Sequence, residues 1–265
     1  KIPSELSIDM YIVDDGSTDG TSLEIQNLYP SINIIQGNGN LFWAGGMRLA
    51  FESVSTESNY DGYLLLNDDV VLKNDFFSKI EETRNFCLIK FGLEGVYTCS
   101  TVDSKSGEVS YGGRRLINEF KSLRFETIQP TNKPQVCHLT NANILYVSSN
   151  VIKEIGFFDK KFTHGIADYD FSLRAFKAGF PVYVTSGIGG FCEDDHGVNL
   201  SFSESLKERI DYLMSPLGIS YSDYLFYIKR HFPKKVVSTF IKLWLRTIFP
   251  TLGNIKNNYN AKKNY

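Results

Sequence analysis

The N-terminal third of the chain alternates between short apolar runs and segments in which apolar residues recur at helical spacing. The apolar runs are rich in β-branched and aromatic residues, which suit strands; they cover residues 7–13, 32–35 and 63–66. The segments with helical spacing cover residues 22–28, 44–54 and 75–84. Strands that alternate with helices predict an α/β fold, in which helices flank both faces of a mostly parallel sheet.

The middle of the chain has a different pattern. Residues 95–150 are rich in Gly, Ser and Thr and contain short apolar runs, which predict β-hairpins or edge strands. Residues 151–162 and 168–180 predict a helix, a loop and a second helix. Gly179, followed by Pro181, suits the end of that second helix.

A late strand at 182–184 is followed by a change of composition. From about residue 206 the chain is helical in pattern, basic and aromatic. We therefore expect an α/β domain at 1–199 and a helical C-terminal extension at 200–265.

Bulk composition narrows the classes of function. The net charge is −2 over 265 residues, so no overall basic field points to nucleic acid as a partner. The 4 cysteines form no C-x-x-C pair, which disfavours a zinc knuckle and indicates reduced core thiols. The sequence shows no signal peptide and no uncharged apolar span long enough to cross a bilayer. A cytoplasmic location is the default expectation.

The segment MYIVDDGSTDGT, residues 10–21, ends an apolar run in a cluster of acids, hydroxyls and glycines. Asp15, Ser17, Asp19 and Gly20 have the spacing of an EF-hand calcium loop. A strand-like run precedes them, however, and Gln26 stands where that loop needs a bidentate Glu. This disfavours calcium and leaves two interpretations: an ordinary strand-to-helix turn, or a nucleotide site at the end of a strand.

Two acid pairs, Asp14-Asp15 and Asp68-Asp69, directly follow apolar strands. In an open parallel sheet, ligands bind outside the carboxyl ends of the strands. Two neighbouring acid pairs repel each other unless a cation or hydrogen-bond donors neutralise them. A nucleoside diphosphate that carries Mg²⁺ or Mn²⁺ would do so. The alternative for Asn67-Asp68-Asp69 is a turn without a ligand.

Four segments in chain order resemble family 2 glycosyltransferases of the GT-A fold; they are VDDGSTDGT, NGNLFWAGGMRLAFE, YLLLNDDVVL and DYDFSLRAFKAGF. The resemblance covers roughly residues 8–200 and is to bacterial, rhamnosyltransferase-like members that build surface polysaccharides. It implies a Rossmann-like sheet, a nucleotide-sugar donor, a divalent ion (Mn²⁺ or Mg²⁺), a saccharide or lipid-linked acceptor, and inversion at the anomeric carbon. Residues 1–199 would then form the nucleotide-sugar-binding and catalytic domain.

The resemblance assigns the donor site residue by residue. Asp14 and Asp15 match the acids that bind the base and ribose. Asn67-Asp68-Asp69 matches the metal motif, in which the last acid, Asp69, is the main ligand.

The segment NGNLFWAGGMRLAF matches the lining of the donor pocket. Gly45 and Gly46 would let the backbone approach the donor closely. Arg48 could reach a phosphate or lie on a solvated helix face.

Asp168 matches the acid taken as the catalytic base, and it also suits a helix N-cap; one residue can serve both roles. Many relatives have Glu before this Asp, but this chain has Ala167, which puts acceptor binding in question. His196, in the segment FCEDDHG, matches a residue that completes the metal site or contacts phosphate, although a solvated loop His is the ordinary case. His164 is a weaker acceptor-site candidate.

Residues 229–249 interleave Lys and Arg with large apolar residues. On a helix, one apolar stripe would contain Val236, Val237, Phe240, Ile241, Trp244, Leu245 and Ile248. Such a stripe suits an anionic membrane surface, here the inner face of the cytoplasmic membrane, or packing on its own domain or a second subunit.

The strand at 7–13 should lie inside the sheet, because it ends in donor-binding acids and is continuously apolar. The strand at 32–35 supplies one neighbour, and we expect the other from a strand before Lys1, in a unit of roughly 30 further residues. Two other classes of function stay open. One is a nucleotidyltransferase that makes the sugar nucleotide, and the other is a non-catalytic saccharide-binding or scaffold protein with the same fold.

Overall fold

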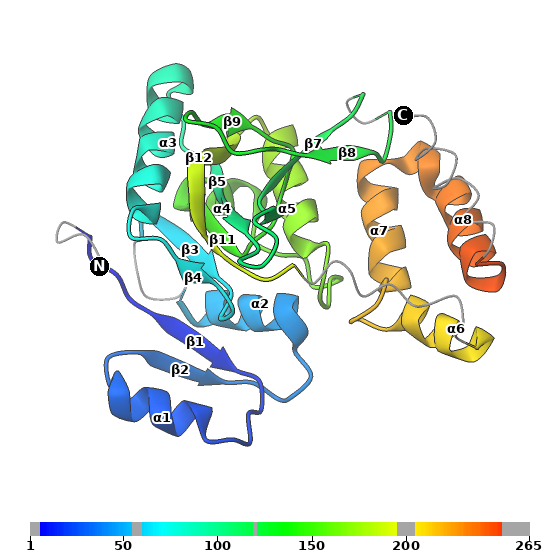
Figure 1. Ribbon diagram of the computed structural model, residues 1–265, viewed down its shortest axis with the longest axis horizontal. Helices are drawn as coiled ribbons and strands as arrows, with labels where there is room; N and C mark the ends of the chain where they lie inside the picture. The colour runs from blue at the N-terminus through cyan, green and yellow to red at the C-terminus, as the bar shows by residue number, and fades with distance from the viewer. Residues whose placement is uncertain (1–5, 55–59, 119–120, 195–204, 251–265) are drawn as a thin grey trace.

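The computed structural model describes residues 6–54, 60–118, 121–194 and 205–250 (Figure 1). Its central sheet has seven strands; the main path runs β3-β11-β5-β12-β4, with β6 paired to β5 and β9 to β12. These strands are β3 (Gly62–Leu66), β4 (Val71–Leu72), β5 (Val96–Val102), β6 (Val109–Tyr111), β9 (Gln135–Val136), β11 (Ile144–Ser148) and β12 (Val182–Phe191). A smaller sheet has the order β10-β7-β8 and contains β7 (Gly113–Leu116), β8 (Phe125–Thr127) and β10 (Leu139–Thr140).

Three strands of the central sheet, β3, β5 and β12, run in the same direction. β12 is parallel to β5, and β11 lies antiparallel between β3 and β5, so β3, β5 and β12 share a direction. The polar residues after β3 therefore lie at one edge of the sheet, where ligands bind in open α/β folds.

Helices cover both faces of this sheet (Figure 1). Along β5 the side chains alternate: Val96 packs in the core shared with α4 (Ser149–Ile155) and α5 (Ala167–Lys177), whereas Tyr97 packs in the core under α3 (Phe76–Phe91). At the end of α5, Gly179 adopts a left-handed φ of 89°, and the N–H groups of Gly179 and Phe180 donate to Phe176 and Ala175. This Schellman motif is the predicted helix end.

The prediction for residues 95–150 is wrong in one respect. β5 and β11 are central strands rather than edge strands or hairpins, and every residue of β5 is buried. Both of its threonine hydroxyls find partners inside: Thr98 donates to the carbonyl of Asn141 at 2.9 Å, and Thr101 bonds Ser110 at 2.9 Å, whereas the buried hydroxyl of Ser100 has no partner among the described residues. A strand of Thr, Cys and Ser is thereby tolerated in the core.

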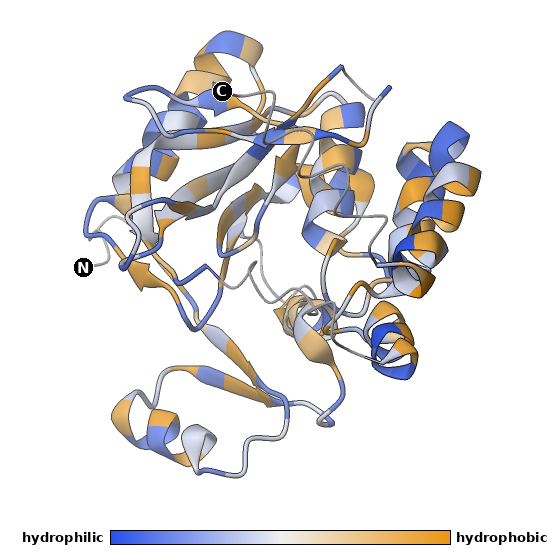
Figure 2. Cartoon of the chain, turned by 45° about the vertical axis from the view of Figure 1, so that its right-hand side comes forward, coloured by the Kyte–Doolittle hydropathy of each residue, from blue (hydrophilic) through white to orange (hydrophobic). Residues whose placement is uncertain are grey.

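A smaller unit carries the first acid pair. It contains β1 (Tyr11–Asp14), α1 (Thr21–Leu28) and β2 (Asn33–Gln36), and it is followed by α2 (Phe42–Val54). β1 and β2 pair in parallel as a separate two-stranded sheet, not inside the central sheet as expected (Figures 1 and 2). Among the described strands, β1 pairs with β2 alone.

The C-terminal segment forms α6 (Leu206–Met214), α7 (Tyr221–His231), a short 3₁₀ turn (Pro233–Lys235) and α8 (Val236–Ile248). A buried ionic cluster fastens α7 to α5. Asp170 is fully buried and accepts hydrogen bonds from Arg174, from Arg230 and from His231. Although burial acts to raise it, the pKa of Asp170 is lowered by His231 and Arg174. His231 therefore has a structural role.

The apolar stripe of α8 points mostly outward. The buried residues of α8 are Thr239, Leu243 and Thr247. Two residues of the stripe also pack on the chain itself: Val236 lies against the main core, and the indole N–H of Trp244 donates to the hydroxyl of Tyr221 at 3.1 Å. The other five residues of the stripe are exposed; they are Val237, Phe240, Ile241, Leu245 and Ile248. No helix in the described ranges combines the length and apolar character needed to cross a membrane.

Candidate active site

The carboxylate of Asp14 is buried and accepts hydrogen bonds from the turn and helix that follow β1. Asp14 is 7% exposed and accepts hydrogen bonds from the hydroxyl of Ser22 and from the N–H of Ser17, the latter at 2.8 Å. These donors hold the pKa of Asp14 at about 2, because they stabilise its charged form. The strand β1, rather than a helix, precedes this turn, which disfavours an EF-hand calcium loop as the sequence indicated.

Asp15 fixes the loop between β2 and α2. One carboxylate oxygen accepts from the N–H of Gly39 and the other from the N–H of Leu41, each at 2.7 Å. The first acid pair thus shapes the path into α2. Contact of Asp14 and Asp15 with a nucleotide stays a prediction.

Gly45 and Gly46 differ in how closely they pack. A Cβ on Gly45 would lie 3.2 Å from Leu41, which is tight, whereas one on Gly46 would lie 3.8 Å from Val13 of β1, an ordinary contact distance. Gly45 thus has a packing role, and close approach of either glycine to a donor stays a prediction.

Arg48 does not lie on a solvated helix face. Its guanidinium is partly buried, and Nη1 donates to the carbonyls of Asp159 and Phe162 at 3.2 and 2.7 Å. Desolvation lowers its pKa. Arg48 therefore ties α2 to the loop before α5, and phosphate contact stays a prediction for its other N–H groups.

Trp43 connects α2 with the second acid pair. Its indole N–H donates to the side-chain oxygen of Asn67 at 2.9 Å, and its ring packs against Phe158 with centroids 5.3 Å apart. The N–H of Asn67 in turn donates to the carbonyl of Asn143 at 3.2 Å. Asn67 is therefore an anchor, which leaves the two acids after it at the surface.

Asp68 and Asp69 are exposed directly after β3. The thiol of Cys192 lies 3.5 Å from a carboxylate oxygen of Asp69. Mg²⁺ and ions like it commonly bind through one or two carboxylates together with substrate phosphates and water. The residues present therefore fit such an ion.

Asp168 lies in the first turn of α5, but it is not the N-cap, because that position belongs to Ile166. Its carboxylate accepts from its neighbour Tyr169 N–H at 2.8 Å and from the N–H of Ala142 at 3.3 Å. Burial raises its pKa to about 6, against the lowering effect of these two N–H groups and of the charge of Arg114. A carboxylate with this pKa is a good general base near neutral pH.

Residues 142–143 contact both the candidate base, Asp168, and the acid motif that begins at Asn67. Ala142 donates to Asp168, and the next residue, Asn143, accepts from Asn67 of the acid motif. The side-chain amide of Asn143 also lies 3.5 Å from the sulfur of Cys192, which contacts Asp69. A candidate base and a candidate metal motif therefore lie on either side of residues 142–143.

A model of glycosyl transferase family 2 matches residues 4–147. The chain belongs to this family. A search of curated protein sequences finds no match.

Solved structures are similar to this chain in fold. A mannosyltransferase of Pyrobaculum calidifontis, solved with GDP-Man and Mn²⁺, is 11% identical with a TM-score of 0.47; the match covers 86% of this chain and 55% of that one. GalNAc-T7, solved with UDP, GalNAc and Mn²⁺, is 10% identical with a TM-score of 0.53; the match covers 77% and 41%. The chain thus spans about half the length of these two proteins. The predicted α/β fold of the GT-A type is confirmed.

The two predicted histidines differ in what the structure shows. His196 lies outside the described residues. His164 accepts at Nδ1 from the N–H of Trp43 at 3.4 Å, and its ring meets Phe42 edge-on with centroids 6.2 Å apart. His164 therefore lies beside the start of α2, and burial lowers its pKa.

Sequence reasoning did not single out Trp43, Asn143 or Arg114. The guanidinium carbon of Arg114 lies 4.8 Å from the ring centroid of Phe125 and 5.6 Å from that of Tyr169, next to the candidate base. Trp43 stands in a segment that the family resemblance had marked, which is a usable signal. Arg114 and Asn143 come from the stretch of short strands, where no local pattern distinguishes them.

Proposed function

We propose that this glycosyltransferase transfers a sugar from a nucleoside-diphosphate sugar, with inversion at the anomeric carbon, to a saccharide or lipid-linked saccharide. The observation that carries the proposal is the convergence on residues 142–143, which brings Asp168 close to the Asn67-Asp68-Asp69 motif. Transfer needs a base at the acceptor hydroxyl and charge stabilisation at the departing diphosphate, on opposite sides of the reacting carbon.

Asp168 is the proposed base. Its carboxylate takes the proton of the acceptor hydroxyl as that oxygen bonds to the anomeric carbon, and the bond to the nucleoside diphosphate breaks on the other face. A pKa of about 6 leaves Asp168 mostly ionised at pH 7 and still basic enough to accept a proton.

Asp69, with Asp68 beside it, is the proposed holder of Mn²⁺ or Mg²⁺, and His196 is the proposed additional ligand. When bound, the ion supplies positive charge that offsets the charge developing on the diphosphate. Asp14 and Asp15 keep the loop before α2 in place for the donor. GalNAc-T7, which has this fold, was solved with UDP and Mn²⁺, and this supports the choice of cofactor and donor.

The biological role that we propose is synthesis of bacterial cell-surface polysaccharide, in the cytoplasm or on the inner face of its membrane. It rests on the resemblance to rhamnosyltransferase-like members of the family.

A panel of nucleotide sugars tests the proposed function. The melting temperature, measured with each donor in Mn²⁺, Mg²⁺ or a chelator, should rise for one donor class and only with metal, by mass action. Transfer of radiolabelled sugar to a saccharide acceptor should follow the same donor. Release of pyrophosphate from a nucleoside triphosphate and a sugar phosphate would instead indicate a nucleotidyltransferase. Absence of any metal-dependent shift would indicate a scaffold.

The exposed face of α8 supports a proposed contact with an anionic membrane or with a second copy of the chain. Val237 is 71% exposed and Ile241 48% exposed, on a helix that also carries Lys242 and Arg246. Replacing Val237 and Ile241 with Ser should remove binding to anionic vesicles if the contact is a membrane, or convert a dimer to a monomer in light scattering if it is a second copy. An unchanged result in both assays would remove this proposal.

A further inference from the structure

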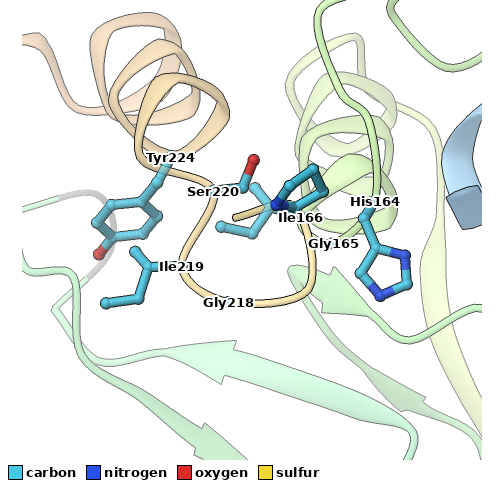
Figure 3. A pocket seen from close by; sticks show the side chains of 8 residues that line it. His164, Gly165, Ile166, Gly218, Ile219, Ser220 and Tyr224 are labelled. Carbon is cyan, nitrogen blue, oxygen red and sulfur yellow. The ribbon is translucent and has the colours of Figure 1, made fainter. Parts of the chain in front are cut away.

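A cavity of about 240 Å³ lies between the loop before α5 and the loop before α7 (Figure 3). Its walls come from two short stretches of chain and the start of α7; they are His164, Gly165, Ile166, Pro216, Gly218, Ile219, Ser220 and Tyr224. The volume is below the usual range of roughly 300–1,000 Å³ for sites that hold drug-sized ligands. It suits one small ring rather than an extended molecule.

Both loops are held in a backbone conformation that their residues avoid. Ile166 has a φ of 68° and Ser220 a φ of 49°, which lie in the left-handed region. For a β-branched residue such as Ile this is a genuine outlier and is energetically unfavourable. Strain of this kind is retained mainly at ligand clamps and active sites.

The two strained residues have the same structural role on opposite walls. Ile166 precedes α5 and its carbonyl accepts from Asp170, while Ser220 precedes α7 and its carbonyl accepts from Tyr224. Each conformation therefore sets where a helix starts. The buried cluster around Asp170 then fixes α5 and α7 relative to each other, which keeps the cavity walls in register.

The lining combines apolar surface with a few polar groups. Ile166 and Ile219 are apolar lining residues, and His164, Ser220 and Tyr224 are lining residues that carry polar groups (Figure 3). No hydrogen bond to another described residue uses the hydroxyl of Ser220 or that of Tyr224. A sugar ring has this same mixture, with C–H faces and hydroxyl edges, and an aromatic ring with a polar tip suits it.

The cavity wall continues into the catalytic residues. Asp168 follows Ile166 by two positions, in the first turn of α5. On the other side, His164 accepts from the N–H of Trp43, whose indole donates to Asn67 of the acid motif. Through Ile166 and His164 the cavity therefore adjoins the two chain segments that carry Asp168 and the acid motif.

We propose that this cavity is a subsite that binds one sugar ring of the acceptor and so places the adjoining hydroxyl at Asp168. The inference rests on the proposed function and specifies where the acceptor is held.

Gly165 offers a direct test, because a Cβ there would meet no atom within 4 Å and its φ lies outside the left-handed range. The series Gly165→Ala, Gly165→Val and Gly165→Leu should fill the cavity progressively. We expect the KM for the acceptor to rise along the series, reaching on the order of 10-fold for Leu, which equals about 1.4 kcal/mol of lost binding. The KM for the donor and the melting-temperature shift caused by the nucleotide sugar should not change.

Two further variants complete the experiment. Tyr224→Phe removes one hydroxyl and should raise the acceptor KM by a smaller factor, and it tests the site even if Gly165→Leu does not fold. Glu154→Leu adds the same apolar side chain at an exposed position of α4, outside the cavity, and should change neither KM.

The outcomes separate the two proposals. If the wild-type protein transfers sugar, and the Gly165 series and Tyr224→Phe leave the acceptor KM unchanged, the subsite is wrong and the proposed function stands. Equal rises of donor and acceptor KM would also overturn the subsite. If the wild-type protein binds no nucleotide sugar and transfers nothing, the proposed function fails, and the subsite with it.

Discussion

The two acid pairs look alike in sequence and differ in structure. Asp14-Asp15 and Asp68-Asp69 each follow an apolar strand, yet the first pair is engaged by the protein and the second is not covered by it. Asp14 and Asp15 together accept from two loop N–H groups, a turn N–H and a serine hydroxyl. Asp68 and Asp69 are exposed, and their nearest described partner is the thiol of Cys192.

Acidic residues at strand ends are therefore of two kinds. A carboxylate with strong N–H donors shapes the backbone and stabilises the fold. A carboxylate left exposed beside another has no such benefit, and it is available to a cation. Substitution should therefore separate the pairs: the exposed pair should affect activity alone, and the engaged pair should affect the fold as well.

The largest effect should come from Asp69→Asn. Loss of a metal ligand should reduce transfer on the order of 10³-fold, since the ion supplies several kcal/mol of charge stabilisation. The melting temperature without ligands should stay close to that of the wild type, because the side chain is exposed. Steady-state transfer assays and circular dichroism melting measure both quantities.

Asp68→Asn is the matched comparison, because it makes the same change at the neighbouring exposed position. We expect a smaller loss of activity there. A wild-type rate in Asp69→Asn would remove the metal assignment, and a large fall in its melting temperature would remove the distinction between the two pairs.

Asp168→Asn should give the second-largest loss of transfer rate. Unlike Asp69→Asn, it should also make the folded protein more stable at neutral pH. Transfer should fall on the order of 10²-fold or more, as for a lost general base, while donor binding persists. Burial raises the pKa of Asp168 from 3.8 to about 6, so the folded state holds its proton more tightly than the unfolded state. Stability is thus lost as pH rises from about 4 to 6, by at most about 3 kcal/mol.

The variant should therefore be more stable than the wild type above pH 6, and the difference should disappear below about pH 4. In the wild type the transfer rate should rise with pH through about 6, as the base ionises. Melting curves and rate profiles over this range measure both. A variant less stable than the wild type at pH 8, or one that loses donor binding, would make Asp168 a structural residue or a donor ligand.

Local sequence patterns were sufficient to predict the elements that have regular apolar spacing and a clear end signal. The α5 segment has helical spacing with Gly179 at its end, and the observed Schellman motif follows from these residues alone. β5 was missed because Tyr97, Thr98 and Ser100 resemble a surface hairpin in composition. Its burial depends on partners such as Asn141, which are remote in sequence.

The candidate site also has features that could be predicted from local sequence and features that could not. Acids at strand ends were found from local signals, since a strand followed by Asp marks one edge of a sheet. Whether each acid has donors could not be predicted, because Gly39 and Leu41 approach Asp15 only after the chain has turned through α1 and β2. The same holds for Arg48, whose guanidinium binds carbonyls more than a hundred residues further along the chain.

Asp14→Asn should show the smallest effect on rate and the reverse dependence of stability on pH. The Ser22 hydroxyl and the Ser17 N–H lower the pKa of Asp14 from 3.8 to about 2, so the folded state favours its ionised form. Its contribution to stability is present above about pH 4 and is lost as pH falls towards 2. The variant should melt a few degrees below the wild type at pH 7, and the difference should shrink at pH 2.5.

Asp211→Asn, at an exposed position of α6, should melt like the wild type at both pH values. A difference for Asp14→Asn that is the same at pH 7 and pH 2.5 would show that its carboxylate charge does not stabilise this turn, and the two acid pairs would then no longer differ in kind.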